Sequence, residues 1–127
     1  MVSLWTVLQR IKAQAAGTDD RATLRIVHEV IEHGPLRLTA LAECAALDAS
    51  TVSRHVSALE AAGHLARTGD PDDRRASRIA VTDSGRALLL EALAQRGRIL
   101  EDAMAGWPPD ERAALAGLMK RLAEDLA

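Results

Sequence analysis

The chain has 127 residues, one cysteine and a formal net charge of −2. Its length fits a single domain, its lone cysteine excludes an intramolecular disulfide framework, and charges interrupt its first apolar stretch, so we expect a cytoplasmic protein without signal peptide or membrane partner. The small negative charge argues against nucleic acid as a partner, because phosphate-binding surfaces usually carry a basic surplus.

The first third of the chain predicts two helices. Apolar residues recur at helical spacing over residues 3–15, which predicts a first helix with a wide apolar face. Thr18 or Asp19 can cap a second helix, whose apolar pattern continues to a glycine and proline stop at residues 33–35. Residues 36–37 then form a short connector, which could contribute an edge strand to a later sheet.

The stretch over residues 39–63 predicts two short helices joined by a tight turn. Thr39 can cap the first helix with its hydroxyl, and Asp48 can cap the second, which would start near Ala49. Gly63 would end the second helix as a left-handed cap residue. Apolar residues recur along that helix at Val52, Val56 and Leu59, which places small hydroxyls and one arginine on its opposite face: Ser50, Ser53, Arg54 and Ser57, with Thr51 at the edge.

This outward face suits DNA readout. Short hydroxyls let a helix lie close to base edges in a major groove, and an arginine can bond a guanine through two hydrogen bonds. The alternative is a solvated face on an ordinary helical hairpin. The next segment favours DNA, since residues 64–67 and 77–81 read as two short strands around a polar turn. A β-hairpin directly after such a helix is a wing.

The C-terminal third predicts two more helices. Thr82 can cap a long helix that runs to about Gly106, and a proline pair at 108–109 separates it from a last helix. The first and last helices carry apolar residues at the same spacing, and burying both within one monomer would leave the long helix unsupported, so we expect a two-fold dimer. The expected interface residues are Leu4, Trp5, Leu8, Ile11, Leu115, Met119, Leu122 and Leu126. The alternative is that both tryptophans, Trp5 and Trp107, pack within a single chain.

The segment from Leu38 to Gly85 resembles, in register, the winged helix-turn-helix of the MarR family of transcriptional regulators. The most specific pieces are Ser53-Arg54-His55 with Leu59-Glu60 and Gly63, the run Asp70-Pro71-Asp72-Asp73-Arg74-Arg75, and Val81-Thr82 with Gly85. Cys44 and Ala46 depart from the family, which often has a charged residue and a glycine at these positions. The resemblance implies a mostly α fold with a small β-wing: a single domain over 1–127, with a winged helix-turn-helix core at 18–85 and dimerisation helices at 1–16 and 86–127.

The resemblance also implies a function. In that family the second helix enters the major groove, a wing arginine reaches the minor groove, and a nearby aspartate holds that arginine in place. By position, Arg75 is the minor-groove arginine, Asp73 its support and Arg74 a second candidate. With His55 added as a phosphate contact, the helix residues expected to contact DNA are Ser50, Thr51, Ser53, Arg54, His55 and Ser57. We therefore expect a repressor that binds a pseudo-palindromic operator in double-stranded DNA as a homodimer and responds to a small-molecule effector of unknown identity.

Other chemistries are less well supported. No basic residue neighbours Cys44 in the sequence to activate its thiol, so we expect a structural role rather than redox sensing. The histidines form no recognisable ligand set with Cys44 or with acids, and the pair His28 and Glu32 is commonly a surface contact, so we expect no metal and no cofactor. No motif indicates Ser-His-Asp catalysis, so an enzyme is not expected. The alternative function is a winged-helix module that binds another protein and no longer binds DNA, which the low positive charge favours.

Overall fold

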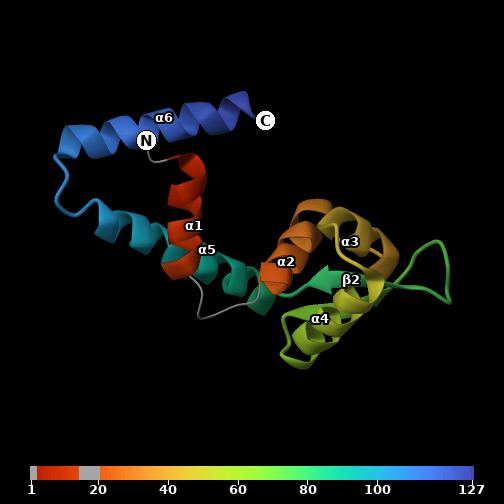
Figure 1. Ribbon diagram of the computed structural model, residues 1–127. Helices are drawn as coiled ribbons and strands as arrows, with labels where there is room; N and C mark the ends of the chain where they lie inside the picture. Colours follow the sequence, from red (N-terminus) through yellow and green to blue (C-terminus); the bar gives the residue numbers. More distant parts are fainter. Residues whose placement is uncertain (1–2, 15–20) are drawn as a thin grey trace.

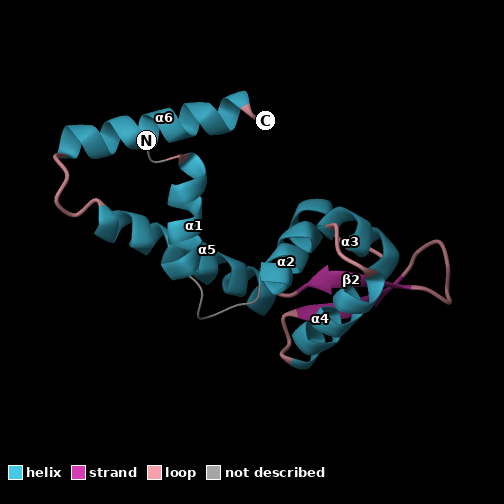
Figure 2. Cartoon of the chain, viewed as in Figure 1, coloured by secondary structure: helices cyan, strands magenta, loops and turns pink. Residues whose placement is uncertain are grey.

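The computed structural model describes residues 3–14 and 21–127. These residues form six helices and one two-stranded antiparallel sheet, in the order α1 (Leu4–Gln14), α2 (Arg21–His33), α3 (Leu38–Ala45), α4 (Ala49–Ala61), β1 (Leu65–Gly69), β2 (Ser77–Val81), α5 (Asp83–Ala103) and α6 (Pro109–Asp125). The fold is mostly helical with a small β-wing, as the sequence predicts (Figure 2). None of these helices is long and apolar enough to cross a membrane. The caps predicted at Thr18 or Asp19 lie outside the described residues.

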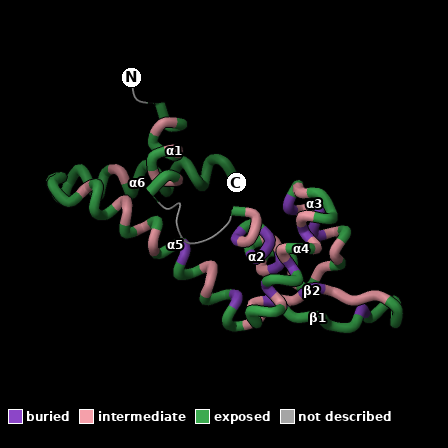
Figure 3. Tube along the Cα trace, turned by 60° about the horizontal axis from the view of Figure 1, so that its bottom comes forward, coloured by how far each residue is buried: buried purple, intermediate pink, exposed green. Residues whose placement is uncertain are grey.

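Helices α2, α3 and α4 pack with the sheet into one body, and α5 leads from it toward α1 and α6 (Figure 1). The core of this body is aliphatic, and Figure 3 shows that most buried residues gather there. Its largest fully buried side chains are Ile26, Val27, Val30, Leu41, Val52, Val56 and Ile79. Each contributes roughly 1.5–3 kcal/mol relative to an exposed position. The inward face predicted for α4 is confirmed, since Val52, Val56 and Leu59 are all buried.

The wing pairs β1 with β2 in antiparallel register over their full length. A third segment joins this sheet, because Leu36 forms an isolated β-bridge with Ile79. The Leu36 amide donates to the Ile79 carbonyl oxygen at 3.0 Å, and the Ile79 amide donates back at 2.6 Å. The connector between α2 and α3 therefore supplies the edge pairing that the sequence suggested.

The start of α3 differs from the prediction. Its N-cap is Arg37 rather than Thr39, the helix begins at Leu38, and no side chain caps it. The reason is tertiary: Leu36 is held in the sheet, so the chain turns into the helix directly after Arg37. At α4 the prediction is confirmed, because Asp48 is the N-cap and accepts from a backbone amide of the first turn.

Both helices of the helix-turn-helix end in left-handed turns. After α4, Gly63 has φ +80°, its amide donates to the Glu60 carbonyl oxygen at 3.0 Å, and the His64 amide donates to that of Leu59 at 2.8 Å. This paired pattern confirms the predicted glycine cap. After α3, Ala46 takes the same position with φ 52°. A left-handed conformation costs an L-residue with a Cβ roughly 1–2 kcal/mol, so this turn is strained.

The start of α5 is fixed against the turn that follows α4. The Thr82 hydroxyl caps the helix as predicted: it accepts from the Gly85 amide at 3.1 Å and donates to the Gly63 carbonyl oxygen at 2.7 Å. Gly85 is buried, and a Cβ at this position would lie 2.1 Å from the His64 carbonyl oxygen. Only glycine allows helix and turn to approach so closely.

The helices at the two chain ends expose their apolar faces. α1 packs against α5, but neither α1 nor α6 contains a buried residue among those described. Of the eight residues predicted at a dimer interface, Ile11 and Leu115 are half-buried and the others are exposed. Trp5 is 66% exposed and Trp107 is 45% exposed, so the alternative that they pack within a single chain is wrong for this structure.

Candidate nucleic-acid interface

The outward face of α4 carries the side chains that the sequence assigns to DNA readout. Its predicted contact residues divide into exposed Ser50, Arg54 and Ser57 and half-buried Thr51, Ser53 and His55. Three of them, Ser53, Arg54 and Ser57, make no side-chain hydrogen bond or ion pair with the part of the chain that the structure describes. These three side chains are therefore available to an external partner.

The N-cap of α4 engages two of the other contact residues. Asp48 accepts from the Ser50 hydroxyl at 2.5 Å, the Thr51 hydroxyl at 2.6 Å and the Thr51 amide at 3.0 Å. These bonds, the one from Ser50 foremost, hold the pKa of Asp48 well below its usual range. Because both hydroxyls donate to Asp48, Ser50 and Thr51 can meet DNA only as acceptors unless the cap opens. His55 also has an internal contact, since its Nδ1 lies 3.1 Å from the Thr23 hydroxyl of α2.

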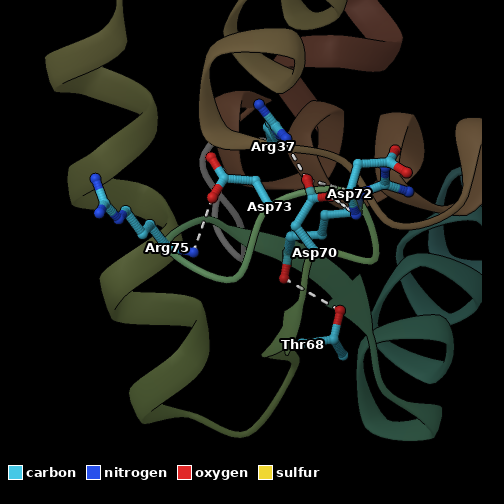
Figure 4. A network of polar contacts seen from close by, with 7 residues as sticks. Arg37, Thr68, Asp70, Asp72, Asp73 and Arg75 are labelled. Carbon is cyan, nitrogen blue, oxygen red and sulfur yellow. Dashed lines mark hydrogen bonds and ion pairs between the residues drawn. The ribbon is translucent and has the colours of Figure 1, made fainter.

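The base of the wing is built around a buried carboxylate, Asp70 (Figure 4). One of its oxygens accepts from Nε of Arg37 at 2.5 Å and from Nε of Arg78 at 3.2 Å, and the other accepts from the Asp72 amide at 2.8 Å. These contacts, that of Arg37 foremost, hold the pKa of Asp70 well below its usual range, and Asp70 raises the pKa of Arg37. The network joins the α2–α3 connector to both strands of the hairpin.

The wing tip carries the two arginines expected to reach DNA. Arg74 and Arg75 are exposed, and neither side chain has a hydrogen-bond or ion-pair partner in residues 3–14 and 21–127. Asp73 does contact Arg75, but not as predicted: its carboxylate accepts from the Arg75 backbone amide at 2.9 Å, while the Arg75 side chain extends away from it (Figure 4). The predicted bond to the arginine side-chain nitrogens is therefore wrong for the described chain, and Asp73 shapes the turn backbone instead.

The network around Asp70 was not found from the sequence. Asp70 follows a predicted strand and Arg78 stands on the returning strand, so a cross-strand ion pair could have been proposed from the hairpin register. Arg37 lies 33 residues away along the chain, and no local pattern indicates its contact with Asp70. That contact depends on the bridge that brings the α2–α3 connector to the sheet.

A second candidate site is a cavity of about 370 Å³ between α2 and α5. Its lining combines basic and aliphatic side chains: Arg21, Leu24, Arg25, His28, Leu89, Leu93 and Arg96. A lining of this kind suits a small molecule that has an apolar body and a negative charge. Among the described lining residues there is no Phe, Tyr or Trp, in line with a chain that contains no Phe or Tyr.

This architecture occurs in known proteins. The model of the MarR family matches residues 19–76. YxaD, an uncharacterised helix-turn-helix transcriptional regulator of Bacillus subtilis (strain 168), is 33% identical over 106 residues, which are 84% of this chain and 74% of YxaD. Transcriptional regulator Tm0710 from Thermotoga maritima has a similar structure, with a TM-score of 0.82 and 24% identity over 97% of this chain and 90% of that one.

A further similar structure is that of BpsR from Bordetella bronchiseptica, whose DNA binding is regulated by 6-hydroxynicotinic acid. It matches with a TM-score of 0.61 and 24% identity over 95% of this chain and 93% of BpsR. The family match spans α2, α3, α4, β1 and the wing loop, and it ends just before β2. The chain therefore belongs to the MarR family of transcriptional regulators.

Proposed function

We propose that the protein is a homodimeric repressor that reads a pseudo-palindromic DNA operator with its α4 helices and wings. Two observations together carry this proposal. On α4, the side chains of Ser53, Arg54 and Ser57 have no partner within the described chain. The wing presents Arg74 and Arg75, and the contacts of Asp70 hold its base in place. A helix with short side chains and one arginine fits the major groove. A wing arginine fits the narrow minor groove, whose negative potential attracts it.

The structure of the wing also bears on the low net charge. Each of its three carboxylates has an intramolecular partner: Asp70 binds two guanidinium groups, Asp72 lies 3.5 Å from Nη2 of Arg78, and Asp73 binds a backbone amide. The tip arginines have no such partner among the described residues. The wing therefore directs its unpaired positive charge outward, although the whole chain is slightly acidic.

The exposed faces of α1 and α6 support the homodimer. On α6 and at its C-cap, the exposed fractions of Leu118, Met119, Leu122 and Leu126 lie between 49% and 78%. Monomeric soluble proteins rarely expose an apolar surface of this kind, and a second copy of the chain would cover it. A two-fold dimer would present two α4 helices, which is why a pseudo-palindromic operator is expected.

The cavity between α2 and α5 supports a small anionic effector. Its lining includes three arginines and the aliphatic side chains Leu24 and Leu89, so a carboxylate on a small apolar body would match both kinds of residue. BpsR offers a parallel, since 6-hydroxynicotinic acid regulates its DNA binding. A ligand held here would contact both the body that carries α4 and the helix that leads to the terminal helices.

The test begins with selection of bound sequences from genomic DNA, followed by titration of the selected operator and of random duplex at fixed salt. Arg54→Ala should lose on the order of 1–3 kcal/mol on the operator and relax the preference at one base pair. Lys120→Ala is a matched control, because it removes one exposed positive charge from α6, away from both reading elements. A parent protein that selects no sequence and binds no duplex at low salt would instead favour the protein-interaction module.

The wing has its own test. Arg75→Ala should weaken operator binding, because it removes the minor-groove contact. Asp73→Ala should also weaken it, since the Arg75 amide loses its partner and the tip loses its fixed direction. Simple electrostatics predicts the reverse for Asp73→Ala, which makes the protein more positive. Tighter binding of Asp73→Ala to both DNAs would contradict the support role of Asp73. If Arg75→Ala binds the operator as tightly as the parent, the wing does not contribute to DNA binding.

A further inference from the structure

Three different metal-binding side chains meet where the end of α2 packs against α3. Glu29 and His33 stand one helical turn apart on α2, and the Glu29 carboxylate lies 3.2 Å from Nε2 of His33. Cys44 joins them from α3, so that the three ligand atoms all lie within 4.8 Å of one another. No such ligand set is expected from the sequence, where Cys44 has no recognisable partner. This is the one group of its kind in the described part of the chain.

We propose that Glu29, His33 and Cys44 bind one divalent transition-metal ion, with zinc as the preferred ion. Thiolate, imidazole and carboxylate are the three donor types of zinc sites, and three protein ligands leave the fourth tetrahedral position for water. Magnesium and calcium select oxygen ligands alone, so this donor set disfavours them. As the sulfur–metal bond forms, the Cys44 thiol releases its proton to solvent. The proposal is independent of the proposed DNA binding.

The arrangement needs little adjustment to reach metal geometry. Tetrahedral zinc with bond lengths of about 2.0–2.3 Å holds its ligand atoms roughly 3.3–3.6 Å apart. The Glu29 and His33 atoms are already 3.2 Å apart. The largest separation in the cluster is at most 4.8 Å, and rotation of side chains can close it. The His33 side chain is 51% exposed, which leaves it room to turn and gives a metal ion a route from solvent.

A bound ion would join the two helices across their connector. That connector carries Leu36, which pairs with the sheet, and Arg37, which binds Asp70 at the base of the wing. Metal binding should therefore stabilise the folded state of the whole α2–α3–wing body, because the unfolded chain does not hold the three ligands together.

The first test uses cobalt(II) as a spectroscopic probe on the reduced, metal-free protein. The parent should bind one cobalt per chain with a thiolate-to-metal charge-transfer band, and zinc should abolish that band by competition. Cys44→Ser should lose the band, and Glu29→Gln and His33→Gln should weaken zinc binding by roughly tenfold or more. Glu32→Gln is the matched control: it makes the same change on the same helix, outside the cluster, and should bind zinc like the parent.

Thermal unfolding gives a second readout that does not depend on the cobalt spectrum. Zinc at about a hundredfold excess over its Kd should raise the Tm of the parent by roughly 5–10 °C, and it should leave that of Cys44→Ser nearly unchanged. If Cys44→Ser does not fold, His33→Gln, which changes the most exposed side chain of the cluster, tests the same loss of zinc-induced stabilisation. The proposal is overturned if the parent binds no metal, if Cys44→Ser keeps parental affinity, or if Glu32→Gln loses as much affinity as Glu29→Gln.

Discussion

Replacing Gly85 with alanine tests the junction between α5 and the turn after α4. The new Cβ would lie 2.1 Å from the His64 carbonyl oxygen and 2.9 Å from a methyl group of Val81. A carbon–oxygen contact is comfortable at roughly 3.3 Å or more, so helix and turn would have to separate by about 1 Å. Two hydrogen bonds oppose this separation: the Thr82 amide donates to that same oxygen at 3.2 Å, and the Thr82 hydroxyl donates to the Gly63 carbonyl oxygen at 2.7 Å.

The expected cost follows from these contacts. Overpacking costs about 1–3 kcal/mol and loss of the Thr82 cap about 1 kcal/mol more, against a gain of about 0.5–1 kcal/mol from replacing a helical glycine. We therefore expect Gly85→Ala to lower the free energy of unfolding by about 2 kcal/mol, measured by urea denaturation followed by circular dichroism.

Gly97→Ala is the matched control on the same helix. A Cβ at Gly97 meets no atom within 4 Å, so this variant should gain about 0.5–1 kcal/mol. The two substitutions are chemically identical and should differ in sign. If Gly85→Ala is as stable as Gly97→Ala, the close approach of α5 to the turn does not exist in solution, and the reasoning fails.

Three further predictions concern the turn, the acid response and the dimer. Ala46→Gly should raise the free energy of unfolding by about 0.5–1 kcal/mol, because it relieves the left-handed strain at φ 52°; a destabilised variant in urea would contradict this. The depressed pKa of Asp48 means that the unfolded chain binds this proton more readily, so its stabilisation is present above the ordinary carboxyl pKa of about 4 and is lost as pH falls below it. In urea denaturation at a series of pH values, the free energy of unfolding of Asp48→Asn should therefore fall less steeply with acid than that of the parent. If the two dependences on pH are the same, other carboxyl groups cause the acid response. Leu8→Asp combined with Leu122→Asp should yield monomer or unfolded chain in sedimentation, since both place charge on the proposed interface, whereas an unchanged dimer would locate that interface elsewhere.

The features that the sequence predicted well are those decided by nearby residues. Apolar periodicity located the helices, and the caps at Asp48, Gly63 and Thr82 formed as expected because each depends on a contact within a turn or two of its helix end. The cap at Thr39 failed because a distant strand decides where that connector ends. Ala46 was recognised as a departure from glycine, but only the structure shows that the backbone keeps the left-handed turn at an energetic cost.

The candidate sites divide in the same way. The outward face of α4 follows from helical spacing, and the hairpin follows from strand alternation, so both were predictable. The contact of Arg37 with Asp70 depends on packing between distant segments, and so does the approach of Cys44 to His33. From the sequence only His28 and Glu32 were named at i, i+4, and the same spacing of Glu29 and His33, which becomes a three-ligand set only when α3 packs on α2, was missed.

The single β-bridge between Leu36 and Ile79 has a mechanical consequence for regulation. It pairs the α2–α3 connector with β2, the central strand of the wing. Asp70, at the start of the hairpin loop, binds Arg37 of the same connector. These two contacts hold the α2–α3 connector to the wing, and α5 connects this body to α6 at the C-terminal end of the chain. In the proposed dimer, we therefore expect a ligand in the cavity between α2 and α5 to alter the distance and tilt between the two winged helix-turn-helix bodies without reshaping either. Effectors should then shift which half-site spacing is tolerated and leave the preferred bases within each half-site unchanged.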